Sequence, residues 1–132
     1  METTDFELVS PEKLLVKQPA EMVVVPGTEG DFGAMPRHAP MITAVRPGII
    51  DVYNGGKVEK RIFVAGGFAE VNETRITVLA QEAIPLAELT AEVAQARLQA
   101  AETELAAAAG EHARNEAERR LLIARAMQAA LA

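Results

Sequence analysis

The stretch Val25–Thr43 reads VPGTEGDFGAMPRHAPMIT and contains three glycines and three prolines. Glycine reaches backbone angles that other residues avoid, whereas proline fixes φ near −65° and lacks an N–H donor. We therefore expect a run of shaped turns and no helix here. The turns carry an acidic tip, formed by Glu29 and Asp31, and a lone His38 beyond it. Apolar runs that we interpret as strands lie on both sides of the stretch.

The composition of the 132-residue chain limits its size and chemistry. Apolar residues at 49% argue for a folded protein of one or two small domains. A net charge of −6 argues against non-specific nucleic-acid binding, because neutralising phosphates needs clustered Lys and Arg. The absence of cysteine excludes disulfides and thiolate metal sites. We see no secretory signal and no apolar run near the roughly 20 residues of a membrane helix, so we expect a soluble protein that meets membranes through partners.

The residue types change sharply near Pro85, which predicts a β domain over residues 1–84 and a helical domain over residues 85–132. β-Branched and aromatic residues dominate the first part, and Ala, Leu, Glu and Arg dominate the second. Short apolar runs without an intervening helix predict eight or more strands in facing antiparallel sheets. The candidate strands are Phe6–Val9, Lys13–Gln18, Ala20–Val25, Met41–Val45, Gly48–Tyr53, Val58–Ala65, Gly67–Val71 and Arg75–Glu82.

Two turns are predicted inside the β part, and two helices after it. Asn54–Gly55 favours a type I′ hairpin because both residues tolerate positive φ, and the run from Val71 to Arg75 predicts a second tight hairpin. Helices are expected over Pro85–Ala108 and Glu111–Ala130, joined at a glycine as an antiparallel hairpin. The first helix starts at Pro85 or is capped by Thr90. Its alanine-rich contacts bury little area, so we expect a weakly held hairpin that can detach or rearrange.

No catalytic constellation emerges from the sequence. The only histidines are His38, for which we favour a structural hydrogen bond or an interface contact, and His112, which we interpret as a solvated turn residue. Neither a zinc site nor another metal or cofactor site is recognisable. The run Gly27–Gly33 lacks the Gly-Lys-Ser/Thr ending of a phosphate loop and carries acids where an anion would bind. Glu29 and Asp31 could form a weak cation site, but a polar contact with a partner is favoured.

The order of residues also resembles one protein family over almost the whole chain. VPGTEGDFGAMPRHAPMITAVRPG at Val25–Gly48 is followed by VAGGFAEVNETRITVLAQEA at Val64–Ala83 and by the alanine-rich hairpin. This series resembles the epsilon subunits of bacterial rotary ATP synthases and is similar to the delta subunit of the mitochondrial enzyme. The resemblance implies an α+β fold: an N-terminal antiparallel β sandwich of about ten strands followed by a C-terminal antiparallel two-helix hairpin.

The resemblance also implies a function and a set of contacts. Members are non-catalytic rotor subunits of the central stalk that couple rotation of the membrane c-subunit ring to the gamma subunit. By position in the motifs, Glu29, Gly30 and Asp31 would face the c ring, and Ser10, His38 and Thr43 would face gamma. Their alternative role is ordinary sandwich surface. The implied location is peripheral, at the cytoplasmic face of the bacterial inner membrane.

In many members the hairpin extends into the catalytic head and inhibits ATP hydrolysis, and some members bind ATP at the start of the first helix. Arg114, Arg119, Arg120 and Arg125 could contact acidic surface of the alpha and beta subunits in the head. The ATP motif, Ile/Leu-Asp-x-x-Arg-Ala, aligns with Leu89–Ala94, where Thr90 replaces the aspartate and Val93 the arginine. A nucleotide would lose its charged partners there, so we expect no ATP binding. A nucleotide-sensing module of the same architecture is the alternative function.

Overall fold

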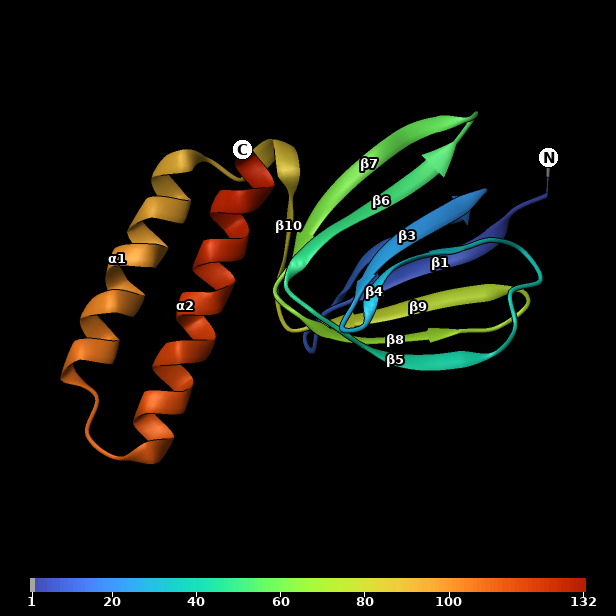
Figure 1. Cartoon of the computed structure of the whole chain (residues 1–132). Helices are drawn as coiled ribbons and strands as arrows, with labels where there is room; N and C mark the ends of the chain where they lie inside the picture. The colour runs from blue at the N-terminus through green and yellow to red at the C-terminus, as the bar shows by residue number, and fades with distance from the viewer. Residues whose placement is uncertain (1) are drawn as a thin grey trace. The chain divides into compact units, whose positions relative to one another are not determined.

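The computed structural model describes residues 2–132, which form two compact units, one ending at Leu86 and the other beginning at Ala87 (Figure 1). The first unit is built of β-strands and the second of two helices, which confirms the predicted fold.

Ten strands make up the first unit, and eight of them overlap strands predicted from the sequence. They are β1 (Thr4–Val9), β2 (Leu14–Ala20), β3 (Met22–Gly27), β4 (Gly30–Ala34), β5 (Met41–Val45), β6 (Gly48–Asn54), β7 (Lys57–Val64), β8 (Gly67–Val71), β9 (Arg75–Ala80) and β10 (Ala83–Pro85). The bounds of β5 and β8 match the prediction to the residue, because alternating side chains are bounded there by glycine, proline and asparagine.

The strands form one continuous sheet in the order β10-β7-β6-β3-β5-β8-β9-β1-β2, with β4 paired to β3. The sheet folds over as a sandwich, with β3, β6 and β7 in one layer and β5, β8, β9 and β1 in the other (Figure 1). Its strands pair antiparallel, except that β1 and β9 are parallel, from Asp5 opposite Arg75 to Val9 opposite Leu79. The expectation of purely antiparallel pairing needs this one correction, since no local signal reports which distant strand β1 will meet.

The core of the sandwich consists of the inward side chains of both layers. In β9 the inward residues Ile76 and Val78 are fully buried, whereas Arg75 and Leu79 point outward. This alternation is the period of two expected for a strand with one buried face. The largest core side chains are Phe6, Leu8, Ile50, Ile76, Val23, Val25, Val52, Val64, Val71 and Val78.

Three local predictions for the β unit need correction. β4 lies inside the stretch predicted to consist only of turns. Backbone hydrogen bonds to β3 stabilise this strand, and a glycine-rich sequence does not predict them. The short β10 was also missed. The type I′ turn between β6 and β7 is centred on Gly55 and Gly56, with φ of 65° and 73°, one residue later than predicted. The second predicted hairpin is confirmed, with the Asn72 amide donating to the Arg75 carbonyl at 2.9 Å.

The second unit is an antiparallel hairpin of α1 (Ala91–Ala107) and α2 (Glu111–Leu131), preceded by a short 3₁₀ turn at Leu86–Glu88. Of the two predicted starts, the later one is correct: the hydroxyl of Thr90 accepts a hydrogen bond from the Val93 amide at 3.2 Å. Gly110, with φ of 90°, lies between the two helices and precedes α2. His112 lies in the first turn of α2 and is exposed.

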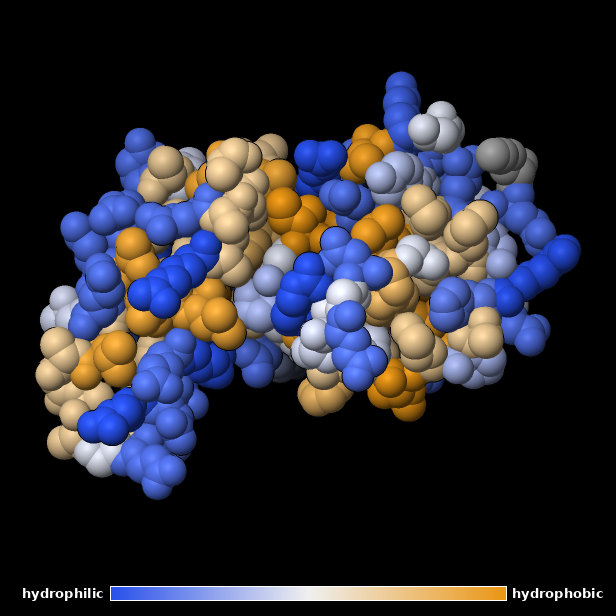
Figure 2. Space-filling model, viewed as in Figure 1, coloured by the Kyte–Doolittle hydropathy of each residue, from blue (hydrophilic) through white to orange (hydrophobic). Residues whose placement is uncertain are grey.

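Small residues dominate the contact between the two helices. Four of the seven buried residues of the two helices are alanines, Ala94 and Ala101 of α1 and Ala117 and Ala124 of α2; the other three are Leu121, Ile123 and Met127. The helices are also joined by polar contacts, in which Gln128 donates to Gln95 and Arg120 pairs with Glu104. Figure 2 shows hydrophobic groups interspersed with hydrophilic groups over the visible face of this unit.

Candidate functional site

Glu29, Gly30 and Asp31 lie together at the β3–β4 hairpin, and we call these three residues the acidic rim. All three are exposed. Thr28 and Glu29 form the turn itself, between the paired residues Gly27 and Gly30. Gly30 has φ of 132°, and a Cβ on Gly27 would lie 2.8 Å from the Gly30 carbonyl oxygen. These two glycines therefore permit a turn that other residues would strain.

Arg46 directly follows β5, a neighbour of β3 in the sheet, and its side chain binds the acidic rim. Its guanidinium donates through Nη1 to the Gly27 carbonyl at 2.6 Å and through Nη2 to the Asp31 carboxylate at 2.5 Å. Its own amide donates to the Pro26 carbonyl at 2.8 Å. No local sequence pattern singles out Arg46, because its partners lie 15 to 20 residues earlier in the chain.

His38 and Thr43 lie on either side of the junction between the loop after β4 and β5. His38 Nδ1 donates to the Ala39 carbonyl at 2.7 Å, and its ring lies 6.4 Å from the ring of Phe32, centroid to centroid. Thr43 is half-buried opposite Ala69, on the core side of β5, and its hydroxyl donates to the Ala44 carbonyl at 3.3 Å. Both polar groups thus have local partners within the chain.

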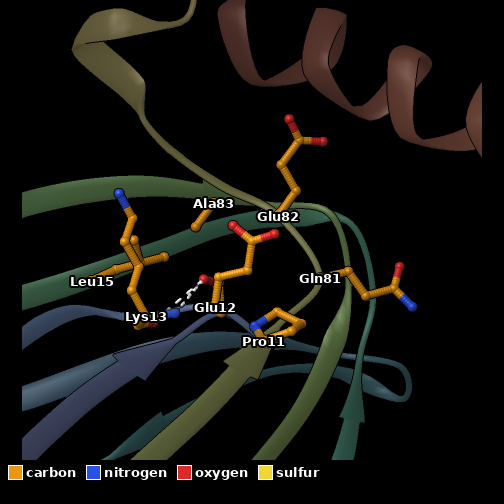
Figure 3. Close-up of a pocket in the computed structure, with 8 residues that line it drawn as sticks. Pro11, Glu12, Lys13, Leu15, Gln81, Glu82 and Ala83 are labelled. Atoms are coloured by element: carbon orange, nitrogen blue, oxygen red, sulfur yellow. Dashed lines mark hydrogen bonds between the residues drawn. The ribbon is translucent and has the colours of Figure 1, made fainter.

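Ser10 lies at the turn between β1 and β2, and β1 is three strands away from the strand of Thr43 in the sheet. Its hydroxyl donates to the Lys13 carbonyl and accepts from the Lys13 amide, both at 3.3 Å. The turn lines a hollow of about 310 Å³, with Gln81, Glu82 and Ala83 on the other side (Figure 3). In Figure 3 the Glu12 side chain points toward the segment that carries Glu82, the Glu82 side chain points away from the β1–β2 turn, and Pro11 lies below both.

Strand register brings five side chains into one row on the outer face of the second layer. Phe68 lies opposite Ala44 and opposite Leu79, and Val9 lies opposite Leu79 and opposite Leu14. Phe68 is 60% exposed, Leu79 47% and Leu14 52%. We call the set the outer apolar row; its members, in strand order, are Ala44, Phe68, Leu79, Val9 and Leu14.

Two of the residues singled out in the sequence are chain neighbours of members of the outer apolar row. Thr43 precedes its first member, and Ser10 follows Val9. Ile42, which is 73% exposed, continues the apolar surface along β5. The next outward positions on β8 and β1 carry Glu70 and Glu7, so a charged border adjoins the row. An apolar centre with a polar border is the usual anatomy of a protein interface.

Sequence reasoning did not identify the members of this row as a surface. The signal available locally was the alternation Gly67-Phe68-Ala69-Glu70-Val71, which places Phe68 on the face opposite Ala69 and Val71. The alignment of Phe68 with Leu79 and Val9 depends on register between strands and could not be obtained locally. A bulge at Leu15 adds to this, because it turns Leu14 outward while Leu15 and Val16 pack on the core.

The four arginines of α2 differ in their partners. Arg120 pairs with Glu104 of α1 and lies 3.9 Å from Glu116, and Arg119 lies 3.4 Å from Glu116. Arg114 and Arg125 are exposed and form no ion pair with residues 2–132. Two of the four are therefore already engaged within the hairpin.

Residues 2–132 contain no group of three or more His, Asp or Glu side chains that could hold a metal ion. One carboxyl group has a shifted pKa: hydrogen bonds from Gln18 at 2.7 Å and Asn54 at 3.2 Å hold the pKa of Glu59 below its usual range. Asn54 also donates to the Pro19 carbonyl. This network joins the end of β2 to the β6–β7 hairpin, and its hydrogen bonds stabilise the fold.

Within residues 2–132, neither helix is long and apolar enough to cross a membrane.

Comparison with known families and sequences gives consistent matches. The family model described as "ATP synthase, Delta/Epsilon chain, beta-sandwich domain" matches residues 3–86. The ATP synthase epsilon chain of Rhodospirillum rubrum is 64% identical over 129 residues, which are 98% of this chain and 96% of that protein. The epsilon chain of Paramagnetospirillum magneticum is 62% identical over 131 residues, covering 99% and 98% of the two chains.

Solved structures give the same result at the level of the fold. A chain from the mitochondrial ATP synthase of Euglena gracilis, in a structure of OSCP, F1 and the c-ring, is 28% identical with a TM-score of 0.81. The match covers 98% of this chain and 82% of that one. A chain from the central stalk and c-ring of the Tetrahymena thermophila enzyme has a TM-score of 0.74 at 12% identity, covers 99% and 98%, and shares the fold.

Proposed function

This chain belongs to the ATP synthase delta/epsilon family, as its glycine- and proline-rich motifs predicted, and we propose that it is a non-catalytic rotor subunit of the central stalk. In this role the sandwich couples rotation of the membrane c ring to the gamma subunit. The chain is bound peripherally at the cytoplasmic face of a bacterial inner membrane, and its partners make that connection.

The outer apolar row is the observation that carries the assignment of the gamma-binding surface. Exposed apolar side chains that line up across five strands are costly in water, and their burial against a partner is favourable. The row begins at Ala44 and includes Val9, so a partner seated on it would lie next to Ser10 and to the backbone of Thr43, whose side chain is on the core side of β5. His38, which follows β4, would contribute at the β5 end.

The acidic rim is proposed as the c-ring contact. Thr28, which adjoins it, donates through its amide to the carbonyl of Ala44, the first member of the outer apolar row. The rim and the row are thus tied to the same end of β5. A rigid sandwich with two contact surfaces joined by backbone hydrogen bonds suits a subunit that transmits torque.

Substitution of Phe68 and Leu79 by aspartate tests the gamma assignment. In the complex reconstituted from its subunits, Phe68→Asp and Leu79→Asp should each weaken binding of the full chain about thirtyfold or more, as expected for a central interface residue. Leu122→Asp is the matched control, because Leu122 is also an exposed leucine, at 58%, but lies on α2. Equal binding of all three variants and the wild type would refute the assignment.

The hairpin is proposed to regulate ATP hydrolysis by leaving its resting conformation. Its alanine contacts bury little apolar area, and Arg114 and Arg125 are unpaired within residues 2–132, so they are available to acidic surface in the head. ATPase activity of the complex with the full chain should be lower than with a chain ending at residue 86. Identical activities would exclude an inhibitory hairpin.

A further inference from the structure

We propose that Arg46 is the positioning residue of the acidic rim, and that Glu29 is the carboxylate the rim presents to its partner while Asp31 serves inside the chain. This inference rests on the proposed contact between the rim and the c ring. It assigns different roles to Glu29 and Asp31, two acids that the sequence analysis did not distinguish.

Arg46 connects both strands of the β3–β4 hairpin through one guanidinium. One nitrogen bonds the Gly27 carbonyl at the end of β3, and another bonds the Asp31 carboxylate near the start of β4. Only arginine offers two N–H donors in a fixed planar fork, so lysine cannot make both contacts at once. The side chains of Arg46 and Asp31 are 43% and 60% exposed, so this clamp lies at the surface, beside the proposed c-ring contact.

The backbone of Arg46 and that of its neighbour reinforce the clamp. The amide of Arg46 donates to the Pro26 carbonyl at 2.8 Å, and the Thr28 amide donates to the Ala44 carbonyl at 3.0 Å. These two bonds hold the β3 side of the turn to β5 and to the residue that follows it. Loss of the guanidinium contacts would leave the turn to these backbone bonds and to the pairing of β3 with its neighbouring strands.

A partner would therefore meet a balanced charge at Asp31 and an unbalanced one at Glu29. The charge of Asp31 is balanced by Arg46, and a partner must compete with that pair to reach it. Glu29 lies at the apex of the turn, is exposed, and forms no ion pair with residues 2–132. A carboxylate that is unpaired and projected outward fits a cationic side chain.

Hydrogen exchange of the full-length chain tests the positioning role without any partner. Arg46→Gln should increase exchange of the Thr28 amide at least tenfold, and Arg46→Lys should give an intermediate value because it restores the charge but not the fork. The Asn72 amide, which is bonded in the hairpin between β8 and β9, is the internal control and should not change. Unchanged exchange at Thr28 would overturn the positioning role.

Binding to the purified c ring tests the division between the two acids. Glu29→Gln should weaken binding at least tenfold, whereas Asp31→Asn and Arg46→Gln should each weaken it less and by similar factors. The double variant Asp31→Asn with Arg46→Gln should bind like either single variant, because both substitutions remove the same Arg46–Asp31 ion pair.

The two measurements separate the inference from the function on which it rests. An effect of Asp31→Asn on binding as large as that of Glu29→Gln would overturn the assignment of Glu29. Faster exchange at Thr28, together with c-ring binding that none of the three substitutions alters, would uphold Arg46 as the positioning residue and refute the contact between rim and ring.

Discussion

Phe68 and Leu79 lie directly opposite each other on β8 and β9, and both side chains point away from the core. Their neighbours Ala69 and Val78 form the next pair along the same strands and are fully buried. One step along the chain thus separates a residue that stabilises the fold from one that is free to contact a partner.

This relationship predicts unequal effects of truncation at an inward and an outward residue of β9. Ile76→Ala should lower the free energy of unfolding by about 2–5 kcal/mol, because it leaves a cavity in the core. Leu79→Ala should change it by less than about 0.5 kcal/mol, because Leu79 is half exposed. Urea denaturation of the isolated full chain measures both values, and similar losses for the two variants would contradict the assignment of faces.

Gly67 is predicted to be irreplaceable at the start of β8. A Cβ at this position would lie 1.9 Å from the Leu79 carbonyl oxygen, and its φ of +149° is unfavourable for other residues. Gly67→Ala should therefore cost more than about 3 kcal/mol of stability. Gly55→Ala is the control: it also has positive φ, at +65°, but nothing within 4 Å, so about 1–2 kcal/mol is expected. Thermal unfolding compares the two, and equal losses would count against the close approach.

Glu59 is predicted to make stability depend on pH in acid. Hydrogen bonds from Gln18 and then Asn54 lower its pKa from the ordinary value of 4.5, so the folded state favours the charged form. The contribution is complete above that value and is lost as the pH falls through the lowered pKa. Urea denaturation of wild type and Glu59→Gln should give a stability difference that is constant from pH 7 to about pH 5 and shrinks below it. A difference that grows in acid would refute the prediction.

The start of α1 is predicted not to bind ATP. Thr90, at the aligned position of the acid, uses its hydroxyl to cap the helix through the Val93 amide. Val93, at the aligned position of the arginine, is apolar and 41% exposed. A nucleotide would find neither a carboxylate nor a guanidinium there. Calorimetry of the full chain near millimolar ATP should detect no binding, and a clear heat with one-to-one stoichiometry would restore the nucleotide-sensing alternative.

Local patterns identified most elements of the fold. Val45 ends one strand and Gly48 begins the next because an intervening proline breaks the pairing, and Thr90 caps α1 because its hydroxyl can reach an amide three residues ahead. β4 escaped prediction because Gly30 and Gly33 have low strand propensity, and only the partner strand β3 stabilises an extended chain there. Tertiary context overrode propensity in this segment.

By itself, the sequence determined the change from strands to helices near Pro85, the turns around Gly27 and Gly30, and the family to which the chain belongs. These follow from local backbone preferences and from the order of motifs. Only the tertiary structure decided which outward side chains share a surface, because register between strands distant in the chain is set by packing of the whole core. That register aligns Phe68 with Leu79, and the same long-range folding brings Arg46 to Asp31.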